Sequence, residues 1–205
     1  MSYFEPHNFP NLEHELAHTG LVCGVDEAGR GALAGDVYAA SVCFHDYANI
    51  PTGINDSKKL TAVKREELYH KIIFCADVGV GVASSQEIDA INILQATMLA
   101  MQRAVAQLSH PPTFALIDGN KVPALAIPAK CLIKGDNLSI SIAAASIVAK
   151  HLRDAHMREL DMIFPQYGFA QHAGYGTKAH MQALHIHGAC AIHRHSFKPM
   201  RGSLS

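Results

Sequence analysis

Two short apolar segments of the sequence each end in acidic residues. Residues 21–25, LVCGV, are followed by Asp26 and Glu27, and residues 114–117, FALI, are followed by Asp118. Carboxylates that directly follow apolar strands lie at the edge of a sheet, where α/β proteins place their sites. We expect Asp26 and Asp118 to converge if the two strands are neighbours. Glu27 projects from the next position, so it converges with them only if its strand ends there.

The rest of the apolar pattern predicts an α/β domain with a mixed sheet. The glycine-rich segment 29–35 indicates a tight reversal, so residues 21–25 and 36–44 are expected to pair as a hairpin. Ser84 and Glu87 form a capping-box pattern that opens a long helix. Further strands are expected at residues 77–83, 114–117 and 124–133, and helices at residues 61–76, 84–105 and 139–163. The expected buried faces are Val63, Leu68, Ile72 and Ile73 in the first helix, and Ile88, Ile91, Leu94, Met98, Met101 and Val105 in the second.

Length and composition exclude several classes of protein. The chain has 205 residues, of which 49% are hydrophobic and 17% charged, which is enough apolar surface for a buried core and excludes overall disorder. We expect residues 1–205 to form a single domain, with an α/β body at about 20–163 and a C-terminal segment at 164–205 that contacts substrate. No uncharged apolar stretch reaches the ~18 residues of a membrane span, and the first residues lack the pattern of a secretory signal. These features predict a cytoplasmic protein.

The cysteines and histidines have simple structural explanations. The five cysteines are scattered without a CxxC pair, so we expect reduced thiols in the core rather than disulfides or a zinc site. The formal net charge is −1, but residues 151–205 carry six basic and three acidic side chains and eight of the 14 histidines. Such a basic flank can contact phosphates, although a small asymmetry can also arise by chance. A solvated helix face or contacts to DNA phosphates, rather than a transition-metal site, are expected for His185, His187, His193 and His195.

A further acidic residue, Asp136, ends a Lys-Gly-Asp segment and is expected at the start of the third long helix. Clustered carboxylates raise each other's pKa and need a counter-charge, and oxygen ligands favour Mg²⁺ or Mn²⁺. Two such ions ~3.5–4 Å apart can activate water and stabilise the leaving oxygen in phosphodiester hydrolysis. For each acid taken alone, a turn or cap role remains an open alternative. The adjacent GRG segment at 29–31 offers backbone N–H groups and a guanidinium to phosphate, or serves only as a hairpin turn.

A series of short motifs extends from residue 24 to residue 197. They are DEAGRG at 26–31, LAG at 33–35, DSKKL at 56–60, LIDGN at 116–120, KGD at 134–136, SIAAASIVAK at 141–150, RD at 153–154, YGF at 167–169, GYGT at 174–177 and HRHSF at 193–197. In this order and spacing, the motifs closely resemble those of bacterial ribonuclease HII, a family of the RNase H-like superfamily.

The resemblance implies an RNase H-like fold, in which helices flank a five-stranded mixed sheet and a small helical part follows at the C-terminus. It implies a metal-dependent endoribonuclease that hydrolyses the RNA strand of RNA–DNA hybrids and cuts on the 5′ side of single ribonucleotides embedded in DNA. The products would be a 3′-hydroxyl and a 5′-phosphate. Such an enzyme would use Mn²⁺ or Mg²⁺, remove ribonucleotides from DNA and act as a monomer.

The resemblance also assigns roles to individual residues. The catalytic, metal-binding carboxylates would be Asp26, Glu27, Asp118 and Asp136. Asp154 matches a position near the second metal, although it could simply pair with Arg158 four residues further on.

The substrate-binding residues implied by the resemblance fall into three groups. The 2′-hydroxyl, which distinguishes RNA from DNA, would be read by Gly29, Arg30 and Gly31. Tyr175 would stack on the sugar at the junction and require a deoxynucleotide on the 3′ side. Backbone phosphates would be held by Ser57 and Lys58.

At three positions the sequence departs from the family pattern. Ala32 and Asp36 stand where proline is usual, which should alter the stiffness of the hairpin rather than the chemistry. Ala173 replaces a lysine, so we expect weaker binding and a shallower salt dependence. Two alternatives remain: a nuclease of the same superfamily with another substrate preference, and a non-enzymatic nucleic-acid-binding module on the same fold. The module would gain nothing from acidic side chains facing phosphate.

Overall fold

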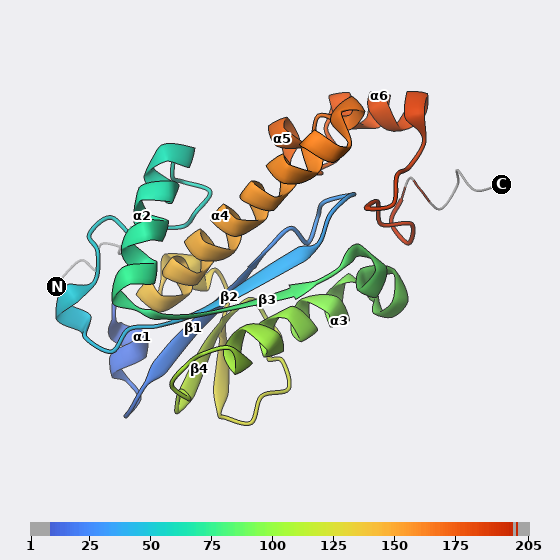
Figure 1. Ribbon diagram of the computed structural model, residues 1–205. Coiled ribbons are helices and arrows are strands. Elements are labelled where there is room, and N and C mark those ends of the chain that lie inside the picture. The colour runs from blue at the N-terminus through green and yellow to red at the C-terminus, as the bar shows by residue number, and fades with distance from the viewer. Residues whose placement is uncertain (1–8, 199, 201–205) are drawn as a thin grey trace, which may run out of the picture.

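A five-stranded mixed sheet lies at the centre of the computed structural model, which describes residues 9–198 and Met200 (Figure 1). The strands lie in the order β3-β2-β1-β4-β5. β1 pairs antiparallel with β2, which confirms the predicted hairpin, and parallel with β4, which meets the condition for the expected convergence of Asp26 and Asp118. The strand bounds are Val22–Ala28 for β1, Val37–Cys43 for β2, Asp77–Ala83 for β3, Phe114–Asp118 for β4 and Ala129–Leu132 for β5.

Helices cover both faces of the sheet. Figure 1 shows α2 and α4 on one face and α3 on the other, with α5 and α6 near the C-terminal end of α4. The helices are α1 (Glu13–Leu16), α2 (Ala62–Cys75), α3 (Ser85–Ala106), α4 (Ile140–Ile163), α5 (Phe169–His172) and α6 (Lys178–His187), with 3₁₀ turns η1 (Tyr47–Asn49), η2 (Gly135–Asn137) and η3 (Pro165–Tyr167). Across residues 9–198, no helix is both long and apolar enough to cross a membrane. Residues 1–8, on which the prediction about a secretory signal partly rests, lie outside the described residues.

Helix α4 packs closely on β1 because small residues line their contact. A Cβ added to Gly24 would lie 2.1 Å from the carbonyl carbon of Ser141, so only glycine fits at this position. On α4, Ala143, Ala144 and Ala145 are fully buried. This close packing holds the beginning of α4 against β1.

Strand β1 is longer than predicted and ends differently on its two sides. Its parallel pairing with β4 stops at Val25 and Ile117, but its antiparallel pairing with β2 continues to Ala28 and Tyr38. The polar residues after Val25 gave no strand pattern in the sequence, and the partner strand β2 supplies their backbone hydrogen bonds. Asp26 therefore lies within a strand whose β4 side is no longer paired.

Strand β5 is shorter than the predicted span of 124–133, because it covers only Ala129–Leu132. Pro123 and Pro128 precede it in the sequence, and proline lacks the N–H that a strand interior needs. The next predicted feature also differs, since Asp136 lies in η2 rather than at the start of α4.

The buried face predicted for the long helix is interrupted in the structure. The capping box at Ser84 and Glu87 is confirmed by both of its hydrogen bonds. Asn92, however, has non-helical angles of φ 68° and ψ 162°, and its side chain accepts the N–H groups of the residues that follow. The helical phase shifts there, so Ile91 is 39% exposed although it was expected to be buried. The buried face predicted for α2 also included too many residues, because Val63 and Ile73 are exposed.

Candidate active site

The structure brings Asp26 and Asp118 together on the face of the sheet that α4 covers. Each lies one position beyond the last paired residues of β1 and β4, so strand alternation directs both side chains to the same face. Asp26 is only 5% exposed. Burial raises the pKa of Asp26 well above its usual range, and the charges of Glu27, Asp118 and Asp136 raise it further.

Asp136 reaches the same place from the turn before α4. The backbone N–H of Gly135 donates to Asp118 Oδ1 over 2.7 Å, which ties η2 to the end of β4. A Cβ at Gly135 would lie 2.6 Å from Ile142 Cδ1 and 3.1 Å from Leu132 Cβ, so this turn packs tightly against both side chains. Burial raises the pKa of Asp136, and Lys58, whose Nζ lies 4.0 Å from Asp136 Oδ2, opposes this.

Glu27 joins the group although its strand continues beyond it. Its convergence was predicted only for a strand that ends there, and that condition was wrong, because β1 continues to Ala28 while Glu27 still lines the same cleft as Asp26 and interacts with the charge of Asp118. Arg30 Nη1 donates to Glu27 Oε1 over 3.2 Å. Burial raises the pKa of Glu27; the Arg30 guanidinium opposes this shift and the charge of Asp118 adds to it.

The four carboxylates lie near enough to shift one another's pKa, and their donors suit a hard divalent cation, but among the described residues no three of them place one oxygen each within 4.8 Å of the others. Asp26 and Asp136 are buried, and negative charge exceeds the positive charge supplied nearby by Arg30 and Lys58. The donors are oxygens without nitrogen or sulfur, which suits Mg²⁺ or Mn²⁺ rather than zinc. A cation would compensate the repulsion that raises the carboxyl pKa values.

A cleft of about 430 Å³ is lined by two of these carboxylates, Asp26 and Glu27, whereas Asp118 and Asp136 are not part of its lining. The cleft contains all six residues that the sequence assigned to substrate binding, together with three to which the sequence assigned no role, Ala28, Ser146 and Lys150. Its lining is Asp26, Glu27, Ala28, Gly29, Arg30, Gly31, Ser57, Lys58, Ser146, Lys150 and Tyr175. Ser146 and Lys150 were not predicted as site residues, although their spacing of four places them on one face of α4.

Two buried arginines stabilise the backbone segments that line this cleft. The sequence analysis did not predict either of them as part of the site. Arg153 is fully buried and donates to the carbonyl oxygens of Ala34, Asp36 and Ala173 over 3.0–3.2 Å. Its guanidinium carbon lies 5.5 Å from the centre of the Tyr175 ring. Arg153 therefore joins the hairpin loop to the segment that carries Tyr175.

Arg194 fixes the glycine-rich loop directly. It is fully buried and donates to the carbonyl oxygens of Arg30, Ala32 and Gly35 over 2.8–2.9 Å. Among the described residues, it forms no ion pair with a carboxylate. The conformation of the loop around Arg30 thus depends on a residue more than 160 positions away.

Asp154 does not pair with Arg158, so that expectation was wrong. Its carboxylate binds Lys150 Nζ at 2.7 Å and Arg65 Nη2 at 3.3 Å. Arg65 lies on α2, which packs on α4, and this tertiary contact supplies a closer cation than the next turn of the helix.

The histidines divide into exposed and buried groups. His185, His187 and His195 are exposed, whereas His193 is 1% exposed, so the prediction of a solvated or phosphate-binding position was wrong for His193. Its Nε2 lies 3.1 Å from His180 Nε2. The five cysteines are free thiols, and Cys23 and Cys43 are buried in the core.

Comparison with known proteins identifies the fold and the family. The solved ribonuclease H2 of Pyrococcus horikoshii is similar, with a TM-score of 0.73 and 26% identity, over 88% of this chain and 95% of that chain. The fold is therefore the RNase H-like fold of the type 2 enzymes. The family model for ribonuclease HII matches residues 23–200.

Curated relatives agree over nearly the whole chain. The ribonuclease HII of Parvibaculum lavamentivorans is 56% identical over 96% of this chain and 74% of its own length. That of Magnetococcus marinus is 53% identical over 95% of both chains. The chain belongs to the ribonuclease HII family, and it is an endonuclease with ribonuclease H activity.

Proposed function

We propose that the enzyme hydrolyses the RNA strand of RNA–DNA hybrids and cuts DNA on the 5′ side of a single embedded ribonucleotide, leaving a 3′-hydroxyl and a 5′-phosphate. The observation that carries the proposal is that Gly29, Arg30 and Gly31 line the same cleft as Asp26 and Glu27. A phosphate beside the carboxylates would bring its sugar next to this loop. The 2′-hydroxyl of that sugar is the group that separates RNA from DNA.

The cation would be held by Asp26, Glu27, Asp118 and Asp136, and Mg²⁺ and Mn²⁺ fit this oxygen donor set. When bound, such ions lower the pKa of water and stabilise the leaving oxygen in phosphodiester hydrolysis. The raised pKa values of Asp26 and Asp136 have a direct consequence for affinity. Because the carboxylates must lose protons to bind a cation, cation affinity should rise with pH.

Recognition of the 2′-hydroxyl requires a loop that keeps its shape. Gly29 has φ +98°, and a Cβ there would lie 1.9 Å from Arg153 Nε, so glycine is required. Arg194 holds the carbonyl of Arg30, and Glu27 holds its guanidinium. We propose that this rigid loop reads the sugar through backbone N–H groups and through Arg30.

The other predicted contacts surround the loop. Tyr175 is 37% exposed and lies against Arg153, so its ring can stack on the sugar at the junction. Ser57 accepts a hydrogen bond from Ser146 Oγ over 2.7 Å, and the side chain of Lys58 is 80% exposed. We propose that Ser57 and Lys58 bind backbone phosphates and that the segment 164–205 contributes further contacts to the duplex.

Asp154 remains a proposed neighbour of the second cation. Lys150 binds its Oδ1 over 2.7 Å, so the lysine would have to turn away first. We also propose that the enzyme acts in the cytoplasm and removes ribonucleotides from DNA. We propose further that it is a monomer, and size-exclusion chromatography measures this oligomeric state.

A cleavage assay on three duplexes tests the proposed function. The duplexes contain a single ribonucleotide, a continuous RNA strand opposite DNA, or DNA only, and each is incubated with Mg²⁺ and with Mn²⁺. The proposal predicts cutting of the first two, with the first cut immediately 5′ to the ribonucleotide, and no cutting of DNA. Binding without turnover in either metal would favour the non-enzymatic module, and cutting of DNA alone would contradict the reading of the 2′-hydroxyl.

A further inference from the structure

We propose that His45, Asp77 and His110 form a second metal site, which binds a divalent transition metal such as Zn²⁺. The three residues come from separate parts of the chain. His45 follows β2, Asp77 is the first residue of β3, and His110 lies in the loop between α3 and β4. One ligand atom from each residue lies within 4.8 Å of the others.

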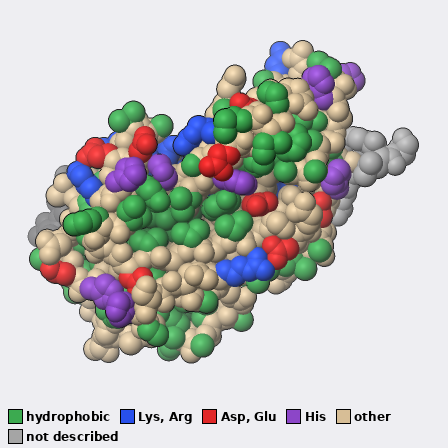
Figure 2. Space-filling model, viewed as in Figure 1, with side chains coloured by type: hydrophobic (Ala, Val, Ile, Leu, Met, Phe, Trp, Pro, Cys, Tyr) green, Lys and Arg blue, Asp and Glu red, His purple; other side chains and the backbone are tan. Residues whose placement is uncertain are grey.

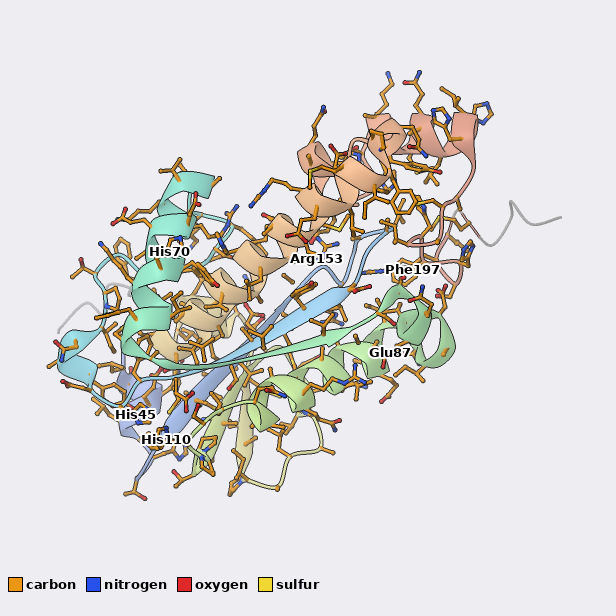
Figure 3. All side chains as sticks on the ribbon, viewed as in Figure 1. His45, His70, Glu87, His110, Arg153 and Phe197 are labelled. Carbon is orange, nitrogen blue, oxygen red and sulfur yellow. The ribbon has the colours of Figure 1, made fainter. Side chains whose placement is uncertain are left out.

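The site is at the opposite end of the sheet from the catalytic carboxylates. Asp77 pairs with Cys43, which in turn pairs with Cys23 near the beginning of β1, whereas Asp118 is the last residue of β4. Figure 3 places His45 and His110 side by side at this end, and Figure 2 shows histidine side chains gathered at the same place on the surface. A metal bound there would be independent of the catalytic one.

The carboxylate of the site is held in position by the backbone. Asp77 Oδ2 accepts the N–H of His110 over 2.8 Å, and Oδ1 accepts the N–H of Ser109 over 3.1 Å. The side chain of Asp77 is 9% exposed, while that of His110 is 66% exposed. Two prolines follow His110 in the sequence and restrict the backbone of this loop. The carboxylate is therefore fixed, and the two imidazoles can turn toward it.

The spacing of the ligand atoms suits a small tetrahedral ion. His110 Nδ1 lies 3.3 Å from Asp77 Oδ2. Two ligands bound at 2.0–2.1 Å with tetrahedral geometry lie about 3.3 Å apart, so this pair needs little movement. The rings of His45 and His110 meet edge to face, with their centres 4.8 Å apart. A small rotation of the His45 ring would bring one of its nitrogens to the third coordination position of the metal. Because the histidines are exposed, the fourth coordination position stays open to water.

The donor chemistry separates this site from the catalytic one. Two imidazoles and one carboxylate favour Zn²⁺ and its neighbours, whereas the oxygen-only cluster around Asp26 favours Mg²⁺ or Mn²⁺. A metal at the second site would connect the end of β2, the start of β3 and the loop after α3. By linking these three segments, the metal would stabilise this end of the sheet.

Calorimetric titration with Zn²⁺ alone tests the proposal. The enzyme and its Asp118→Asn variant should both bind one Zn²⁺ at this site, because loss of a catalytic carboxylate leaves it intact. The double variant His45→Ala/His110→Ala should bind Zn²⁺ more than about 10-fold more weakly. The matched control, His185→Ala/His195→Ala, removes two exposed histidines elsewhere and should bind as the unchanged enzyme does.

Thermal unfolding supplies a second readout. Zn²⁺ should raise the Tm of Asp118→Asn but not that of His45→Ala/His110→Ala, because only Asp118→Asn retains the second metal site. Cleavage in Mg²⁺ should be unchanged in His45→Ala/His110→Ala, which also shows that this variant folds. Unaltered Zn²⁺ affinity in His45→Ala/His110→Ala, or an equal loss in the control, would overturn the proposal.

Discussion

Acid should destabilise the enzyme through His193, because burial and the neighbouring His180 lower the pKa of its imidazole from 6.5 to about 4. The residue lies in the segment that holds the glycine-rich loop. Its neighbour Arg194 binds the carbonyl of Arg30, and His193 itself forms a β-bridge with Ala34. Protonation of His193 therefore acts on the contacts that position Arg30.

The size of the effect follows from the two pKa values. The unfolded chain binds the proton more readily than the folded one, so the stabilising contribution of neutral His193 is fully present above pH 6.5 and is lost as the pH falls to about 4. One pKa unit corresponds to ~1.4 kcal/mol, so the full loss in the free energy of unfolding is about 3 kcal/mol. About 2.5 kcal/mol of this loss is reached at pH 4.5.

Urea unfolding at pH 7.5 and at pH 4.5 measures this loss. The difference between the two free energies of unfolding should be about 2.5 kcal/mol smaller in His193→Gln than in the unchanged enzyme. His185→Gln, which alters an exposed histidine of α6, is the matched control and should leave the pH dependence unchanged. If His193→Gln were as sensitive to acid as the unchanged enzyme, protonation of His193 would not be the cause of the acid sensitivity.

Three further substitutions test separate parts of the structure. Gly24→Ala should lower the free energy of unfolding by more than about 2 kcal/mol, because its methyl group would lie 2.1 Å from the backbone of Ser141; an unaltered Tm would contradict this packing. Ser84→Ala should cost about 1 kcal/mol in urea unfolding, because its hydroxyl caps the first turn of α3, and a stability equal to that of the unchanged enzyme would exclude the cap. Ala173→Lys should tighten duplex binding and steepen the plot of log Kd against log salt by about 1, whereas an unchanged slope in fluorescence anisotropy would count against the phosphate contact.

The convergence of the acidic residues could be predicted from the sequence. Apolar runs followed by Asp26 and Asp118 mark strand ends, and neighbouring parallel strands end at the same edge of a sheet. The detailed end of β1 could not be predicted, because the DEA segment at 26–28 has no strand pattern of its own. It becomes a strand only through its antiparallel pairing with β2.

The support of the cleft also depends on long-range contacts that local patterns do not contain. Arginine is rarely buried without a carboxylate partner, so no local pattern predicts that Arg153 and Arg194 lie in the interior. Their partners are backbone carbonyls 20 to 164 residues away, and carbonyls exist at every position in the chain. His193 escaped prediction for the same reason, since its burial depends on His180 across the C-terminal segment.

We propose that Asp118 and the neighbouring carboxylates bind the divalent cation on which cleavage depends. The most direct measurement is the rate at which a duplex with one ribonucleotide is cut, as a function of Mg²⁺ concentration, by the enzyme and by Asp118→Asn. The asparagine keeps an oxygen that can accept the N–H of Gly135, so the fold should be preserved. We predict that Asp118→Asn binds the duplex at least as tightly and does not cut it at any Mg²⁺ concentration. Cleavage by Asp118→Asn at the rate and Mg²⁺ dependence of the unchanged enzyme would contradict the account.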